Sequence, residues 1–308
     1  MKLHQDAQFV PTRENVSLLL NMYGLTLAGY ETADSGIENC TIMIRALSGK
    51  YVLRVYRQHK KNHQDVQGEL DFVMYLGENG IPVAPPLPNL ERSLVSWLDQ
   101  SGYTWRAILM RHAPGGHPDR YSSGLIVNLA TIQARMHNLA ALYTPKNAYN
   151  KELTELKETH FIRLIKDRKA LEPNLQDFVT RAENYVVHLD SSLPKGLCHL
   201  DFDRDNVLCR RDVVTAVLDF DDLMLAPYVV CLAYALWDVA YDLGLDGSAA
   251  YIEAYEKIRQ LTDQEKSFIK PIMLLRHYAI GCMDISHKQM DESALSRLLN
   301  LERELLSL

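Results

Sequence analysis

The pattern of side chains changes near residue 113, and this change restricts the chain to few folds. Before it, four apolar and β-branched runs are typical of strands, at 40–47, 50–57, 93–99 and 103–111. Ser48-Gly49 and Ser101-Gly102 separate them into hairpins, and a run of helical spacing covers 62–79. After it, the periodicity predicts helices near 122–143, 151–170, 174–189, 228–243, 247–260, 263–282 and 291–306. The chain is therefore expected to be α+β, with a small antiparallel sheet crossed by one helix and a larger helical part.

These elements predict two lobes with a short connection. We expect an N-terminal lobe over 1–111, a hinge over 112–118 and a helical lobe over 119–308. Thr262 and Glu265 have the spacing of a helix capping box. Short strands interrupt the helical lobe only between about 196 and 220, and clefts between lobes are where ligands usually bind.

Composition excludes several classes of protein. The 308 residues are 47% hydrophobic, enough for a substantial core, and the formal net charge of -6 with dispersed basic residues argues against a nucleic-acid partner. The five cysteines form no CxxC pair, which indicates neither a disulfide framework nor a zinc site and fits a reducing cytoplasm. No apolar run approaches the length of a membrane span, and the first ten residues lack the apolar stretch of a signal peptide. Oligomeric state is not readable from these features.

The segment HLDFDRDNVL, residues 199–208, concentrates three aspartates on alternate positions. Asp201, Asp203 and Asp205 match the first ligands of a calcium-binding EF-hand, with Asp212 at the twelfth place. However, Asn206 stands where that loop needs glycine, and the flanking sequences predict strands rather than two helices. The calcium-binding interpretation is therefore set aside.

A second acidic cluster, DFDD at 219–222, follows a strand that can pair back on the segment after Asn206. Such a hairpin would bring the clusters together, and two carboxylates about 4 Å apart repel by roughly 4 kcal/mol at an effective dielectric near 20, so a cation is expected. Asparagine and aspartate oxygens suit Mg²⁺. In phosphoryl transfer, Asp201 would be the base that accepts a hydroxyl proton, with Asn206, Asp219 and Asp221 as metal ligands. Any one of these aspartates alone would more simply cap a turn.

The pattern HxDxxxxN followed by DFD resembles the aminoglycoside phosphotransferase and homoserine kinase type II superfamily, small-molecule relatives of protein kinases. The resemblance covers about residues 20–280. It implies a protein-kinase-like bilobal fold, ATP and Mg²⁺ as cofactors, and transfer of the γ-phosphoryl group to a hydroxyl of a small molecule. Its catalytic and metal motifs are specific, whereas GIENC, YVLRVYR and LATIQARMHNLA are individually weak matches.

Matching residues to this superfamily assigns further roles. Arg54 takes the place of the strand lysine that contacts the α- and β-phosphates, and Glu69 that of its helix partner. His199 resembles the histidine that braces the catalytic loop. Ser35 falls in the nucleotide-binding loop, and the adenine pocket would involve the side chains of Val52, Leu208 and Leu218 and the hinge from Met110 through His112 to Ala113. The same apolar residues are equally compatible with simple core packing.

Three departures from the superfamily leave an alternative open. Leu200 replaces a usual glycine, Asp203 replaces a frequent histidine, and arginine stands at position 54. A nucleotide-binding module without catalysis is the alternative that these departures motivate. The acidic loop suits an amine-bearing acceptor, such as an aminoglycoside, a homoserine-like amino acid or an amino alcohol. Tyr228, Tyr234, Trp237 and Tyr241 would form a cage for a quaternary amine, although helical spacing favours core packing.

Overall fold

The structure is a computed structural model that describes residues 8–33, 39–57, 61–145, 153, 155–158, 160–165, 169, 171–287 and 291–307. The chain divides into two compact units. One comprises Met1–Gly115 with Thr144–Tyr149 and Thr215–Leu218, and the other comprises Gly116–Tyr143, Asn150–Val214 and Asp219–Leu308. Within the described residues, no helix is long and apolar enough to cross a membrane.

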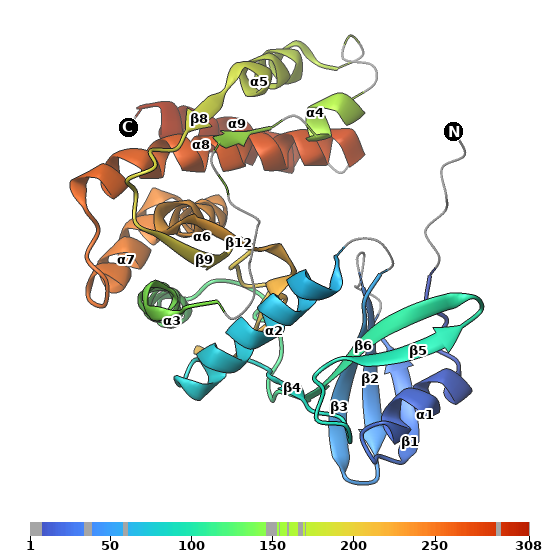
Figure 1. The fold of residues 1–308 in the computed structure, drawn as a ribbon. Helices are drawn as coiled ribbons and strands as arrows, with labels where there is room; N and C mark the ends of the chain where they lie inside the picture. Colours follow the sequence, from blue (N-terminus) through green and yellow to red (C-terminus); the bar gives the residue numbers. More distant parts are fainter. Residues whose placement is uncertain are drawn as a thin grey trace. The chain divides into compact units, whose positions relative to one another are not determined.

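The first unit is built on a six-stranded sheet with the order β1-β2-β3-β6-β4, in which β5 pairs with β6 (Figure 1). The strands are β1 (Leu27–Thr32), β2 (Cys40–Ala46), β3 (Gly49–Val55), β4 (Pro86–Leu87), β5 (Ser96–Gln100) and β6 (Tyr103–Arg111). The two predicted hairpins are present as β2–β3 and β5–β6. Tyr51, Leu53 and Val55 alternate into the core of this unit, so Val52 and Arg54 lie on the opposite face of β3.

Two helices complete this unit. The predicted helix is α2 (His63–Glu78), which begins where the side chain of Asn62 accepts a hydrogen bond from the Asp65 amide at 2.8 Å. Its Val66 and Leu70 pack on Tyr56 and Ile108, on the face of the sheet that carries Arg54. The prediction of one helix here missed α1 (Arg13–Asn21).

The second unit is mainly helical. Its long helices are α3 (Ser123–Leu142), α5 (Pro173–Asn184), α6 (Tyr228–Leu243), α7 (Leu245–Glu256), α8 (Asp263–His287) and α9 (Glu292–Ser307). Helix α6 packs against α7 and α8, and α3 packs against α7 (Figure 1). The capping box is confirmed, because Glu265 N donates to Thr262 Oγ1 at 3.1 Å and Thr262 N donates to Glu265 Oε2 at 3.0 Å.

One predicted helix of this unit is wrong and another is too long. The segment predicted as one helix over 151–170 contains β7 (Glu155–Lys157) and the short α4 (His160–Leu164). Helix α5 ends at Asn184, and β8 (Val186–His188) follows and pairs with β7. The β-branched Val186 and Val187 favour this strand, and its partner is too far along the chain for periodicity to indicate it.

Candidate active site

Two strand pairs position the acidic segments. Strand β9 (Lys195–His199) pairs with β12 (Leu223–Pro227) so that His199 lies opposite Leu223. Strand β10 (Val207–Arg210) pairs with β11 (Val213–Val217), which confirms the predicted hairpin. The loop 200–206 therefore leaves β9 beside the point where residues 219–222 enter β12. Strands on both sides of this loop also exclude the two helices of an EF-hand.

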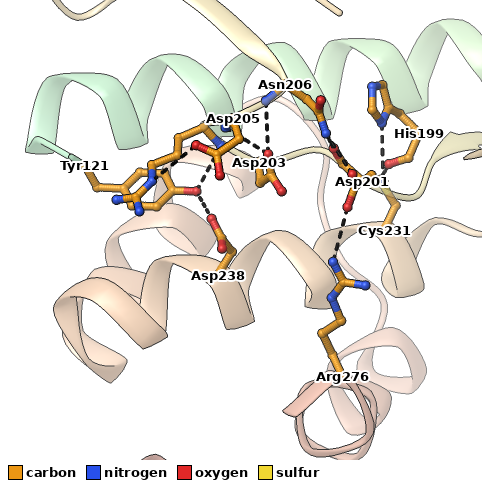
Figure 2. Close-up of polar contacts among 10 residues, drawn as sticks. Tyr121, His199, Asp201, Asp203, Asp205, Asn206, Cys231, Asp238 and Arg276 are labelled. Atoms are coloured by element: carbon orange, nitrogen blue, oxygen red, sulfur yellow. Dashed lines mark hydrogen bonds and ion pairs between the residues drawn. The ribbon is translucent and has the colours of Figure 1, made fainter. Parts of the chain in front are cut away.

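Asp201 is held by Asn206 at the other end of the loop (Figure 2). Asn206 Nδ2 donates to the Asp201 carboxylate at Oδ2 and to the Asp201 carbonyl, both at 2.8 Å. The side-chain N–H groups of Asn206 thus both donate to Asp201, and the side-chain oxygen Oδ1 of Asn206 can act as an acceptor for another group. The five-residue spacing accordingly fixes the rotamer of the predicted base and orients an oxygen that suits a cation.

His199 is buried beneath the loop and braces it. The Asp201 amide donates to His199 Nδ1 at 3.3 Å, and Cys231 Sγ donates to the His199 carbonyl at 2.9 Å. Phe220 packs on the ring with centroids 4.7 Å apart. Because Nδ1 accepts the hydrogen bond of the Asp201 amide, this nitrogen holds the loop backbone, which suits a structural contact rather than proton transfer.

Arg276 on α8 is a site residue that the sequence analysis missed. Its Nη2 donates to Asp201 Oδ1 at 3.2 Å (Figure 2). Its guanidinium lies over the ring of Tyr234, 4.8 Å from the ring centroid. Both carboxylate oxygens of Asp201 therefore have partners. No local pattern could have identified Arg276, since 75 residues separate it from Asp201.

Further carboxylates surround the loop. Asp203 accepts hydrogen bonds from the amides of Asp205 at 2.9 Å and Asn206 at 3.1 Å. Burial, together with the negative charges of Asp201 and Asp238, raises the pKa of Asp203 to about 7. Burial also raises the pKa of Asp238, which accepts a hydrogen bond from the Tyr121 hydroxyl. In Figure 2, Asp238 points from α6 to the Tyr121 hydroxyl, and Asp203 lies beside the loop amides.

The residues expected to hold Mg²⁺ lie at the ends of the two strand pairs. Asp219 is exposed and has a φ of 56°, a left-handed conformation that aspartate tolerates better than most residues, and it precedes the 3₁₀ turn Phe220–Asp222 that contains Asp221. Among the described residues, no three His, Cys, Asp or Glu side chains form a metal-binding cluster. The carboxylates of Asp219 and Asp221 nevertheless fit Mg²⁺, because this ion is usually bound by only one or two carboxylates together with water and substrate phosphates.

In the first unit, Arg54, predicted to contact phosphates, and Val52, predicted to line the adenine pocket, lie on one face of β3. Arg54 is opposite Ile108 on β6, and Val52 is opposite Met110. Glu69 on α2 is buried, and it accepts hydrogen bonds from Lys61 Nζ at 2.6 Å and from the Tyr56 hydroxyl at 3.3 Å. Lys61 is thus a cation beside Glu69 that the sequence analysis did not single out.

The other expected nucleotide-binding residues are placed as follows. The amide of His112 donates to the Lys50 carbonyl at 3.3 Å, so this donor of the hinge is used within the first unit. Leu208 lies on β10 and Leu218 follows β11, and both are half-buried. Ser35 lies outside the described residues. Their roles toward a nucleotide stay predictions.

The aromatic residues considered as an amine cage pack in the protein itself. Tyr228 and Trp237 are buried, and Trp237 donates to His277 Nδ1 at 3.1 Å. Trp237 and Tyr241 stack with centroids 5.3 Å apart. The face of the Tyr234 ring is covered by the guanidinium of Arg276, which is a cation of the protein itself. Core packing therefore accounts for these residues.

Comparison with known proteins identifies the protein family. Residues 29–267 match the phosphotransferase enzyme family, and the chain belongs to it. The predicted superfamily and its kinase-like α+β fold are confirmed, and the class of activity is phosphoryl transfer.

Individual relatives act on different acceptors. A homoserine kinase from Methylobacillus flagellatus is 29% identical over 245 residues, which cover 75% of this chain and 71% of that protein. Among solved structures, an amicoumacin kinase in complex with AMP-PNP, Ca²⁺ and its ligand has a TM-score of 0.66 at 18% identity, covering 97% of this chain and 90% of that one. A microcompartment-associated aminopropanol kinase has a TM-score of 0.64 at 19% identity, covering 92% of each chain. At these identities the solved structures establish the fold alone.

Proposed function

We propose that this protein transfers the γ-phosphoryl group of ATP, with Mg²⁺, to a hydroxyl of an amine-bearing small molecule. The observation that carries the proposal is the Asp201–Asn206 pair, in which the amide nitrogen of Asn206 holds the carboxylate of Asp201 at the other end of one loop. Membership of the phosphotransferase family supports the reaction. The carboxylates of Asp203 and Asp238 support an acceptor that carries an amine.

In the proposed reaction, Asp201 accepts the proton of the acceptor hydroxyl as its O–H bond breaks. The oxygen forms a bond to the γ-phosphorus, the bond from that phosphorus to the β–γ bridging oxygen breaks, and ADP leaves. Asn206, Asp219 and Asp221 would hold Mg²⁺, which neutralises charge on the phosphates. His199 and Asn206 hold Asp201 in place and transfer no proton.

The test is an acceptor screen with ADP release as the readout, using amino alcohols, hydroxy-amino acids and aminoglycosides. Asp201→Asn keeps the size of the side chain but removes the base, so turnover should fall by about a hundredfold to ten-thousandfold. Asp246→Asn, on the exposed first turn of α7, is the matched control and should retain turnover. Full turnover by the Asp201 variant would rule out its role as the base.

A nucleotide-binding module without catalysis is the competing function. Partners on both oxygens of Asp201 are the observation that favours it. It requires stabilisation by Mg-ATP on heating with no phosphorylated product from any acceptor, so one confirmed product excludes it.

A further inference from the structure

Arg276 places a protein cation beside the predicted base. Its guanidinium is supported by the Tyr234 ring at 4.8 Å, and Nη2 makes a single hydrogen bond of 3.2 Å to Asp201. The side chain is 23% exposed, so part of it faces solvent at the loop. An arginine so placed would repel a purely cationic acceptor and attract an anionic group next to the reacting hydroxyl.

The hydrogen-bonding edge of Arg276 is incompletely used. Its Nε is buried and has no hydrogen-bond partner among the described residues. Arg181 shows an arginine that uses both donors of this edge, because its Nε and Nη2 donate to the two carboxylate oxygens of Glu302 at 2.7 and 2.8 Å. A buried donor without a partner is unfavourable, and a carboxylate that took both donors of Arg276 would satisfy it.

The groups facing Arg276 complete a site for two charges. Asp203 and Asp238 point into the region between the loop and α6, to one side of Asp201, and Arg276 approaches Asp201 from α8 (Figure 2). A hydroxyl that reaches Asp201 would therefore have Asp203 and Asp238 on one side and the Arg276 guanidinium on the other. The charge of Arg204 offsets part of that of Asp238, so Asp203 is the carboxyl group with less compensation. This distribution suits an acceptor with both an ammonium and a carboxylate group.

We propose that Arg276 binds a carboxylate of the acceptor, so that the acceptor class is a hydroxy-amino acid rather than an amino alcohol or a polyamine. This inference rests on the proposed kinase function and names its substrate class. When the acceptor carboxylate takes Nη2 of Arg276, Oδ1 of Asp201 is released from its hydrogen bond and becomes available to the acceptor hydroxyl. Binding of the correct acceptor and exposure of the base are then a single event.

A purely structural Arg276 would behave differently. It would brace Asp201 in every state, and its loss would lower stability and turnover equally for all acceptors. A carboxylate-binding Arg276 instead discriminates between acceptors that differ only in the carboxylate. The distinguishing readout is therefore the ratio of kcat/KM values within matched pairs.

The experiment measures kcat/KM for three pairs, each a hydroxy-amino acid and its decarboxylated amine. They are homoserine with 3-amino-1-propanol, threonine with 1-amino-2-propanol, and serine with ethanolamine. Wild type should favour the acid of its best pair by about 10- to 100-fold, the range of a charge-assisted hydrogen bond. Arg276→Gln should abolish this preference by raising KM for the acid, and Arg276→Lys should restore part of it, because lysine keeps the charge but not the two-donor edge.

Arg259→Gln is the matched control. Arg259 also lies over a tyrosine ring at 4.8 Å, that of Tyr228, and binds Glu265 at 2.8 Å. Its loss should leave the acid-to-amine ratio unchanged even if stability falls. An unchanged ratio in Arg276→Gln, or a wild-type preference for the amine, would overturn the inference while leaving the kinase function in place.

A binding experiment distinguishes failure of the proposed kinase function from failure of the proposed carboxylate site. If no pair gives product, the proposed function fails for this class of acceptor. Isothermal titration of the three acids into wild type and Arg276→Gln then decides the carboxylate site alone. Binding of an acid to wild type that weakens at least tenfold in Arg276→Gln supports it, and absence of binding, or equal binding to both proteins, contradicts it.

Discussion

At the scale of single residues, Asp201 is held by partners from three parts of the chain. His199 precedes it on β9, Asn206 follows it on the loop, and Arg276 reaches it from α8. The family resemblance predicted that His199 braces the loop. Asn206 was predicted as a metal ligand, and its hydrogen bond to Asp201 was not predicted. The contact of Arg276 depends on the packing of α8 against α6, which no local pattern contains.

His277 makes stability depend on pH. It is buried, and its Nδ1 accepts the indole N–H of Trp237, which can only donate. Burial lowers the pKa of His277 to about 4 from the ordinary value of 6.5, although the charge of Glu302 opposes this effect. The unfolded chain therefore binds a proton below pH 6.5 that the folded protein resists, so stability present at neutral pH is lost as the pH falls from about 6.5 to 4.

Urea unfolding at pH 7.5 and pH 5 measures this effect. From pH 7.5 to pH 5, the free energy of unfolding should fall by roughly 2 kcal/mol more in wild type than in His277→Gln. Glutamine keeps an acceptor for Trp237 but does not titrate. Equal losses in the two proteins would show that His277 is not the group responsible.

Tyr121 supports the acidic region through its hydroxyl group. It donates to Asp238 and accepts the Arg204 amide at 3.2 Å. Tyr121→Phe leaves a half-buried carboxylate and an amide without this partner, so the free energy of unfolding should fall by about 1–3 kcal/mol. Thermal melts check this, with Tyr103→Phe on the exposed side of β6 as a control. A loss no larger than that of the control would contradict the assigned role.

At the scale of elements, α2 is attached to the sheet by a buried ion pair. Glu69 and Lys61 have side chains only 3% and 10% exposed, and the Lys61 carbonyl accepts a hydrogen bond from Arg106 on β6. Helical periodicity predicted α2 within one residue at each end, but not the cation that binds its buried glutamate. Ion pairs of this kind depend on side-chain packing rather than on sequence spacing.

Lys61→Met should lower the free energy of unfolding by about 3 kcal/mol, because it removes a cation in contact with a buried carboxylate. The double variant Lys61→Met/Glu69→Leu should recover most of this loss. Lys257→Met breaks an exposed pair with Glu253 on α7 and should cause no measurable change. If the Lys61 and Lys257 variants lose the same stability, the buried pair does not hold α2.

Helix α8 packs closely on α5 at Gly281. A Cβ atom at this position would lie 2.5 Å from the Phe178 ring. Alanine normally favours a helix by about 1 kcal/mol over glycine, but here the clash should dominate and Gly281→Ala should destabilise by about 1–3 kcal/mol. Gly116→Ala, with no atom near its added Cβ, is the control for denaturant unfolding. A more stable Gly281→Ala variant would refute the close packing.

At the scale of the whole molecule, the sequence predicted the division into a sheet-containing part and a helical part. Amphipathic helices such as α3 and α6 and the β2–β3 hairpin depend on local periodicity and turns, which sequence contains. Strands β7, β8 and β12 are short and exist through pairing with distant segments, so they were missed. For the same reason Asp201 and Asn206 were predictable as a site, whereas Arg276 was not.

The central claim is phosphoryl transfer at the loop that carries Asp201. The most direct measurement is mass spectrometry of the acceptor after incubation with ATP and Mg²⁺, for wild type and Asp201→Asn at equal folded concentration. Wild type should add one phosphoryl group to a hydroxyl-bearing small molecule, and the variant should form this product at least a hundredfold more slowly. A phosphorylated acceptor that accumulates equally fast with both proteins would contradict the claim.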